Sequence, residues 1–105
     1  DDVPPGAPLE LKATVRTNGI LLNWKAPETA ADGESPYGYV VYRFTEVEDT
    51  RIESAANILK ISFDAGTSFL DETAVAGIRY RYLVTAIDRM KNESLPSNLE
   101  AVAVE

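Results

Sequence analysis

The sequence predicts an all-β fold, a sandwich of about seven antiparallel strands in two sheets. Short segments in which apolar and polar residues alternate recur along the chain, and clusters of turn-forming residues separate them. The chain has no regular alternation of strands with long amphipathic helices, a pattern that would predict a parallel sheet. Its 105 residues, of which 45% are hydrophobic, are enough for one domain with a single buried core.

The longest alternating segment runs from Ile78 to Asp88, and the other elements are organised around it. One face of this predicted strand carries Tyr80, Tyr82, Val84 and Ala86. The opposite face carries Arg81, Leu83, Thr85 and Ile87. Tyrosines and β-branched residues suit a half-buried strand, so we expect this segment to lie inside a sheet.

Two further strands are predicted before residue 28. The apolar face of the first consists of Leu9, Leu11, Ala13 and Val15. A turn at Thr17-Asn18-Gly19 leads into the second, whose apolar face consists of Ile20, Leu22 and Trp24. Three prolines and a glycine in residues 1–8 predict an extended linker, which leaves 9–105 as the domain.

Residues 37–45 are predicted to form a third strand after a polar loop at 28–36. Both faces of this strand are rich in apolar residues, with Tyr39 and Val41 on one face and Val40, Tyr42 and Phe44 on the other. A strand of this kind is covered on both sides. The shared alternation of the second, third and sixth strands places five residues in the core: Trp24, Tyr39, Tyr80, Tyr82 and Val84.

The hydrophobic period changes between residues 52 and 59. Ile52, Ala55, Ala56 and Leu59 fall at the spacing of one helix face, so a short helical insertion is predicted near 52–58. Short strands are then predicted at 59–63, 68–71 and 99–104, the last after an irregular start at Pro96.

The composition excludes several function classes. The chain has neither cysteine nor histidine, so it lacks disulfides, thiolate chemistry and the commonest acid–base and metal-binding group. A net charge of −7 disfavours binding to nucleic acid and to anionic membrane surfaces. No apolar segment is long enough for a membrane helix, and no cofactor is expected. The chain starts at Asp1 without a signal peptide, so we expect a mature protein or a fragment of a longer one.

Four stretches of the chain together resemble one family: PPGAP, ILLNW, GYVVYR and AGIRYRYLVTAIDRMKNESLPS. Their order and spacing are similar to those of the fibronectin type III domain, an immunoglobulin-like sandwich. The resemblance implies that Tyr80, three residues after Gly77, is the residue of a tyrosine corner. Its ring would fill the core, and its hydroxyl would bond backbone within residues 73–77. Trp24 would pack against Tyr39 and Tyr82.

The version that the chain resembles is bacterial. The segments VTAID, KNES and PSN and the insertion IESAANILKI look like modules attached to secreted glycoside hydrolases and related glycosidase-like proteins. This resemblance implies a non-catalytic accessory module, a spacer or docking domain, in a larger extracytoplasmic protein. The implied partner is a neighbouring domain of the same polypeptide. The alternative is a module that binds a glycan, such as a polysaccharide, or a protein through surface aromatics.

The sequence gives little support to a catalytic or a metal-binding role for its polar residues. Carboxylates lie in two loop regions, at Glu46, Glu48 and Asp49 and at Asp64, Asp71 and Glu72, where we expect solvated surface charge. Calcium ligation by Asp71 with Glu72, or by Asp88 with Asn92, would need more oxygen ligands than these pairs supply. Asn92-Glu93-Ser94 matches a glycosylation sequon, and a hairpin turn is the simpler interpretation. No catalytic residue is assigned.

Four aromatic residues lie outside the predicted core and are the candidates for stacking against a sugar: Tyr37, Tyr42, Phe44 and Phe63. In a fibronectin type III sandwich the strands that carry Tyr42 and Leu83 are neighbours, so the family resemblance joins five residues into one apolar patch: Val40, Tyr42, Phe44, Leu83 and Ile87. We expect Ile52, Ile58 or Leu59 to cover Tyr42 and Phe44. Part of Leu83 and Ile87 would then remain exposed, which makes Tyr42, Phe44, Leu83 and Ile87 the predicted docking surface.

Overall fold

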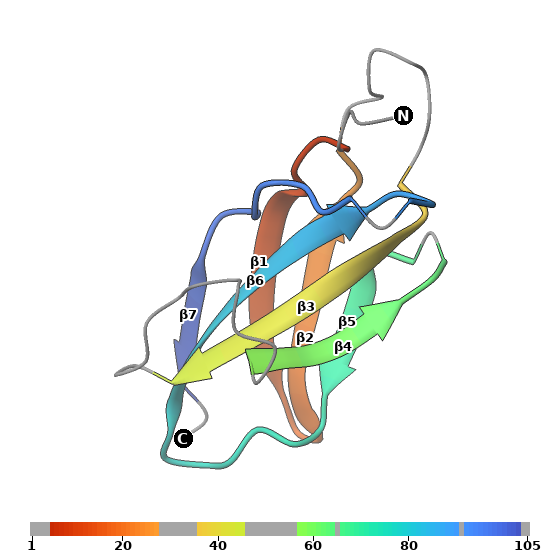
Figure 1. The fold of residues 1–105 in the computed structure, drawn as a ribbon. Coiled ribbons are helices and arrows are strands. Elements are labelled where there is room, and N and C mark those ends of the chain that lie inside the picture. The colour runs from red at the N-terminus through yellow and green to blue at the C-terminus, as the bar shows by residue number, and fades with distance from the viewer. Residues whose placement is uncertain (1–4, 28–35, 46–56, 65, 91, 104–105) are drawn as a thin grey trace.

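The computed structural model describes residues 5–27, 36–45, 57–64, 66–90 and 92–103. Within these ranges seven strands form two antiparallel sheets, one with the order β1-β2-β5 and the other with the order β4-β3-β6-β7. Figure 1 shows the two sheets packed face to face. The strands are β1 Leu9–Arg16, β2 Gly19–Lys25, β3 Gly38–Thr45, β4 Ile58–Ser62, β5 Ser68–Asp71, β6 Arg79–Ile87 and β7 Glu100–Ala103. The predicted all-β sandwich is therefore confirmed.

The predicted helical insertion needs a correction at its end. Residues 52–56 lie outside the described residues, and Ile58 does not continue a helix but begins strand β4. Backbone pairing explains the difference, because β4 runs antiparallel to β3 and Ile58 lies opposite Tyr42. Pairing with β3 therefore determines the conformation of Ile58 and Leu59, at the described end of this segment.

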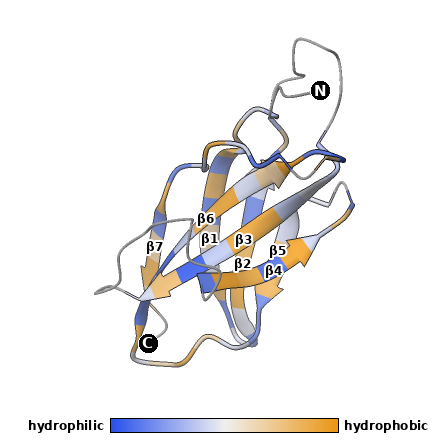
Figure 2. Cartoon of the chain, viewed as in Figure 1, coloured by the Kyte–Doolittle hydropathy of each residue, from blue (hydrophilic) through white to orange (hydrophobic). Residues whose placement is uncertain are grey.

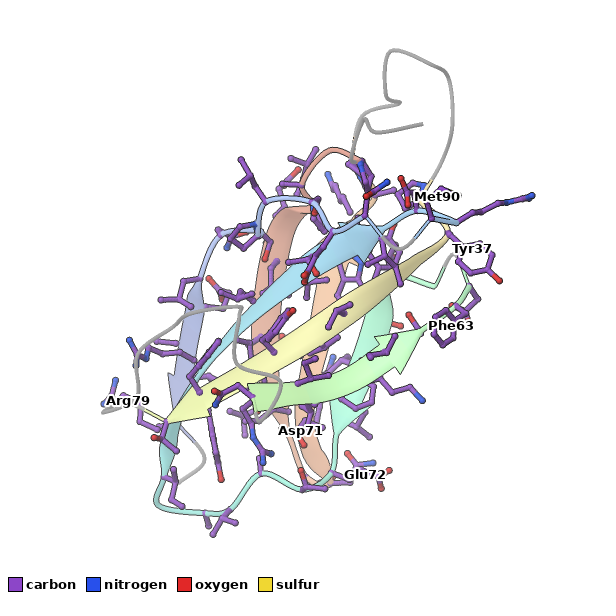
Figure 3. All side chains as sticks on the ribbon, in the orientation of Figure 1. Tyr37, Phe63, Asp71, Glu72, Arg79 and Met90 are labelled. Carbon is purple, nitrogen blue, oxygen red and sulfur yellow. The ribbon has the colours of Figure 1, made fainter. Side chains whose placement is uncertain are left out.

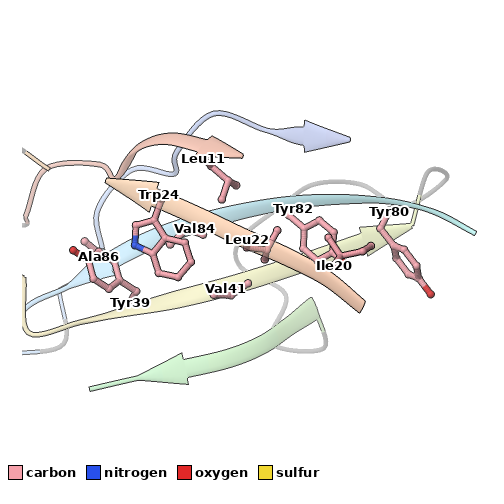
Figure 4. Packing of buried hydrophobic residues seen from close by; sticks show 10 residues of the cluster. All are labelled: Leu11, Ile20, Leu22, Trp24, Tyr39, Val41, Tyr80, Tyr82, Val84 and Ala86. Carbon is pink, nitrogen blue, oxygen red and sulfur yellow. The ribbon is translucent and has the colours of Figure 1, made fainter. Parts of the chain in front are cut away.

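The main core lies between the two sheets (Figure 4). All five residues predicted for it are buried, together with Leu11, Ile20, Leu22, Val41 and Ala86. The rings of Trp24 and Tyr39 meet edge to face with their centroids 5.4 Å apart, an arrangement that aromatic pairs favour. The side chains of β2, β3 and β6 therefore interdigitate as their alternation predicts.

A second apolar cluster lies on the opposite face of the larger sheet. Val40, Tyr42, Phe44, Leu83 and Ile87 form it, and Ile58 packs against it. Figure 2 shows that apolar residues recur along β3, β4 and β6, the strands that contribute to this cluster. Strand β3 is thus buried on both faces, as its sequence predicts.

The start of β1 departs from simple alternation. The register of β1 against β2 shifts between Leu9 and Lys12, and Glu10 has a φ angle of 53°. A bulge of this kind changes which face the preceding side chains occupy, and Leu9 is exposed although Leu11 is buried. Pro8 is also fully buried, so the packed part of the chain begins at least one residue before β1.

Candidate functional site

The most connected polar group of the described residues is the carboxylate of Asp71, at the end of β5. Its Oδ1 accepts hydrogen bonds from the backbone N–H and the hydroxyl of Thr73, at 3.0 and 2.7 Å. Its Oδ2 accepts from the guanidinium of Arg43 at 3.0 Å and from the hydroxyl of Tyr82 at 2.6 Å. Arg43 also donates to the Thr73 hydroxyl at 2.7 Å. One carboxylate therefore joins β3, β5 and β6.

These contacts decide the charge state of the cluster. Burial by itself would raise the pKa of Asp71, but hydrogen bonds from Tyr82, Thr73 and Arg43 outweigh it, so the pKa lies below its ordinary value. Burial, together with the negative charge of Asp71, raises the pKa of Tyr82. At neutral pH the cluster holds an ionised carboxylate, a cation and a neutral phenol.

The Asp71 cluster has the features of a structural network, not of a catalytic site. Asp71 is only 1% exposed, and each of its oxygens already accepts two hydrogen bonds. These four hydrogen bonds occupy the accepting positions that a carboxylate offers, so none is left for a substrate. The prediction that Asp71 carries solvated surface charge is wrong, because the alternation of β5 places it on the same face as Phe69, which packs against the core. That alternation was the sequence signal for its burial.

Tyr80 forms the expected corner. Its hydroxyl accepts a hydrogen bond of 2.9 Å from the backbone N–H of Val75, within the predicted range of 73–77. The guanidinium of Arg43 lies 4.9 Å from the centre of the Tyr80 ring, on its face. Arg43 therefore contacts both the carboxylate of Asp71 and an aromatic ring, a double role that the sequence analysis did not identify.

The other carboxylates considered for catalysis or metal binding do not come together in the described part of the chain. Glu46, Glu48 and Asp49 lie outside the described residues. Asp64 and Glu72 are exposed. The carboxylate of Asp64 accepts a hydrogen bond of 2.9 Å from the backbone N–H of Gly66, two residues along the chain. Among the residues that the structure describes, no three Asp or Glu side chains are grouped so that they could hold a metal ion.

Asp88 and Asn92 shape the loop after β6. The carboxylate of Asp88 accepts the backbone N–H groups of Met90 and Asn92, each at 2.9 Å, and the side-chain amide of Asn92 at 3.1 Å. These hydrogen bonds, that of the Asn92 backbone first, lower the pKa of Asp88. The hydroxyl of Ser94 is buried, where it accepts from Ala86 and donates to the Leu95 carbonyl. The glycosylation sequon is thus built into a closed hairpin turn.

The predicted docking surface needs the largest correction. Its four residues do come together, but Leu83 and Ile87 are only 4% and 5% exposed, and Tyr42 and Phe44 are also buried. A polar side chain contributes to the burial of this face. The carboxylate of Glu93 accepts hydrogen bonds from the hydroxyls of Tyr42, at 2.5 Å, and Thr85, at 2.6 Å. Ile58 packs on this cluster as expected, whereas Leu59 packs on the main core and Ile52 lies outside the described residues. These four residues therefore form core, not an open surface.

The exposed aromatic residues are instead Tyr37 and Phe63. They are 42% and 53% exposed, with ring centroids 6.0 Å apart and ring planes tilted by 53°. They lie beside each other where β3 begins and β4 ends (Figure 3). The backbone N–H of Tyr37 donates to the Ile87 carbonyl at 2.8 Å, which ties the pair to the end of β6.

Gly38 allows the two rings to approach. A Cβ atom at this position would lie 2.0 Å from the carbonyl oxygen of Ser62 and 3.0 Å from the Cα of Phe63. Only glycine permits β3 and β4 to come this close, and the close approach places the residues that flank Gly38 and Ser62 side by side. The backbone packing thus holds Tyr37 and Phe63 side by side, and both residues are exposed.

Comparison with known proteins identifies the architecture around these residues. A family model described as fibronectin type III domain, SaeA third domain, matches residues 8–105. No curated protein sequence matches the chain significantly. Across the parts of the chain that the structure describes, no helix has the length and apolar character needed to span a membrane.

Three solved structures illustrate the fold likeness. An Fn3-like protein from Clostridium thermocellum has 21% identity and a TM-score of 0.73, and the match covers 96% of this chain and 94% of that one. A beta-1,2-glucanase from Parabacteroides distasonis has 22% identity and a TM-score of 0.72, over 94% of this chain and 12% of that one. The Clostridium perfringens spore cortex lytic enzyme SleM has 20% identity and a TM-score of 0.67, over 95% and 28%. This chain therefore spans a small part of the two larger proteins.

Proposed function

The chain belongs to the fibronectin type III family, and from this premise we propose that it is a non-catalytic accessory module, a spacer or docking domain. We propose further that its parent is a larger secreted bacterial protein that acts on carbohydrate. The observation that carries the first part is the state of Asp71, the one buried carboxylate of the described residues, whose oxygens are all engaged in holding strands together. The chain also has neither histidine, the most frequent general acid–base residue, nor cysteine, a common nucleophile.

The proposal that the parent protein acts on carbohydrate is supported by solved structures with the same fold. Two larger proteins that contain this fold are described as a beta-1,2-glucanase and a spore cortex lytic enzyme. In each of them the matching part is a minor fraction of the chain. A domain of this kind would contact a neighbouring domain of its own polypeptide and would lie outside the cytoplasm. Its acidic surface favours neither nucleic acid nor an anionic membrane.

The test uses the complete gene product, with and without residues 8–105. We expect removal to leave hydrolysis of a small soluble glycoside unchanged and to lower the thermal stability of the remaining domains or their activity on polymeric substrate. Cell fractionation would test the proposed location. A gene product that consists of this domain alone, or one whose other domains bear no relation to carbohydrate, would refute the corresponding part of the proposal.

A second function, saccharide binding by the module itself, is favoured by the exposed Tyr37–Phe63 pair. Aromatic rings can stack on the C–H faces of sugar rings, and this pair is fixed by the packing of Gly38 against Ser62. The tilt of 53° between the rings suits a single twisted chain better than a flat crystalline surface. The predicted candidates Tyr42 and Phe44 cannot take this role, because both are buried.

Affinity electrophoresis of the isolated domain in gels that contain soluble β-glucans would test this second function. We expect retardation that is lost in the double variant Tyr37→Ala, Phe63→Ala. The matched control is Val75→Ala with Ile78→Ala, which removes two exposed apolar side chains from the loop between β5 and β6. Retardation that survives the aromatic double variant, or equal loss in the control, would exclude the pair as a binding site.

A further inference from the structure

The turn between β1 and β2 holds an asparagine whose surroundings differ from those of the other four. Asn18 is exposed and is the only asparagine in the sequence that precedes a glycine. Arg16 pairs with Gly19, so Thr17 and Asn18 form the whole turn. Within the described residues the side chain of Asn18 makes no hydrogen bond, which leaves its amide free to move.

The other asparagines are restrained by contacts. The Asn98 amide accepts the N–H of Leu11 and donates to the Leu11 carbonyl, and Asn92 is bound to Asp88. Asn57 donates to the carbonyl of Arg43 at 3.2 Å. Asn23 is exposed, but the nitrogen that follows it belongs to Trp24 and donates to the Thr67 carbonyl at 3.0 Å.

We propose that Asn18 is a site of spontaneous deamidation, which converts it to aspartate and isoaspartate. The backbone nitrogen of Gly19 attacks the side-chain carbonyl carbon of Asn18, its proton passes to the departing nitrogen, and ammonia leaves. The resulting cyclic imide then takes up one water molecule. Opening at the side-chain carbonyl gives aspartate, and opening at the main-chain carbonyl gives isoaspartate. Glycine favours ring closure because it has no side chain to obstruct the attacking nitrogen.

The structure also links this modification to the stability of the fold. Isoaspartate adds one carbon to the main chain in a turn of only two residues. Gly19 has little room to move, because its backbone packs so closely on β5 that a Cβ atom built on it would lie 2.4 Å from the carbonyl oxygen of Asp71. Ile20 is paired with Asp71 as well. An isoaspartate at position 18 therefore displaces the strand that supports the Asp71 cluster.

The test incubates the 105-residue chain at mildly alkaline pH, folded and in urea, followed by peptide mapping with mass spectrometry and isoaspartate-specific methylation. We expect Asn18 to lose its amide before the other four asparagines in the folded chain, and faster in urea, where the Arg16–Gly19 pairing is absent. The control Asn18→Gln should show no loss at this position. Isomerisation at Asp32-Gly33 would also give a methylated isoaspartate, but it leaves the mass unchanged, so the mass of each mapped peptide distinguishes the two sites.

Two outcomes would overturn the proposal. The first is an Asn18 amide that stays intact in the folded chain while another asparagine reacts. The second concerns the predicted loss of stability. To measure it, the chain that carries isoaspartate at position 18 is separated, and its urea midpoint is compared with that of the variant Asn18→Asp. A lower midpoint for the isoaspartate fraction alone is expected, and equal midpoints would show that the turn accommodates the longer backbone.

Discussion

The hydroxyl of Tyr82 donates a hydrogen bond of 2.6 Å to the carboxylate of Asp71, across the interface between the two sheets. Tyr82 lies on β6 of the four-stranded sheet, and Asp71 ends β5 of the three-stranded sheet. The same carboxylate binds Arg43 of β3, so the charge is compensated where it is buried. A buried ion pair often adds little net stability, but removal of one partner leaves the other uncompensated.

The first prediction is that Asp71→Asn destabilises the domain by about 2–4 kcal/mol. The variant keeps the shape of the side chain, but its amide NH₂ must face hydrogen-bond donors at one of the two oxygen positions. Urea unfolding followed by Trp24 fluorescence would measure the change. The matched control is Glu72→Gln, an exposed neighbour, for which a change within about 0.5 kcal/mol is expected. Equal effects of the two substitutions would contradict the role assigned to Asp71.

The second prediction concerns pH. Because the pKa of Asp71 is lower in the folded chain than its ordinary value of 3.8, its contribution is present in full above that value. This contribution is lost as the pH falls through the lower pKa of the folded state. The stability difference between the wild type and Asp71→Asn should therefore be constant at neutral pH and shrink below about pH 4. A difference that stays constant down to about pH 2 would show that the charge of Asp71 is not responsible.

The sequence was sufficient to predict the sandwich and its main core because alternation determines both. On β2, β3 and β6 the residues predicted for the core follow a period of two, and each of them faces the opposite sheet in the structure. The corner at Tyr80 could be predicted from its spacing to Gly77 by family resemblance. These features depend on local spacing, which a single sequence contains.

The docking surface could not be predicted correctly, because burial of an outer face depends on long-range contacts. Glu93 lies 51 residues from Tyr42, and nothing in the sequence indicates that its carboxylate reaches the Tyr42 hydroxyl. The Tyr37–Phe63 pair also depends on contact between strands, through the close approach of Gly38 to Ser62. Period-two patterns show which residues share a face, but they do not show what covers that face.

The third prediction is that Tyr80→Phe costs about 1–2 kcal/mol. The ring stays in the core and keeps its contact with Arg43, while the bond from the Val75 N–H is lost. Hydrogen exchange at the Val75 amide provides a specific readout, because this proton should become less protected in the variant. Unchanged protection at Val75 would mean that the Tyr80 hydroxyl does not hold this loop.

The fourth prediction is that Gly38→Ala destabilises the domain by about 1–3 kcal/mol or more, because the new methyl group meets the backbone of Ser62. Strands β3 and β4 must separate, which also parts Tyr37 from Phe63. Nuclear Overhauser contacts between the two rings would report the separation. The control is Gly66→Ala, where the methyl group approaches only the flexible side chain of Asp64, and ring contacts should persist there.

The fifth prediction distinguishes buried core from docking surface at Leu83. An exposed Leu83 would tolerate a charge, whereas the structure places it in the cluster with Val40, Tyr42, Phe44 and Ile87. Leu83→Glu should therefore destabilise the isolated domain by about 3 kcal/mol or more, since a carboxylate would be placed in a buried apolar cluster. The matched control is Val75→Glu, at an apolar position that is 54% exposed, and it should change the urea midpoint little. A Leu83→Glu domain as stable as the control would show that this face opens in solution, and it would restore the outer face of β3 and β6 as a surface for a neighbouring domain.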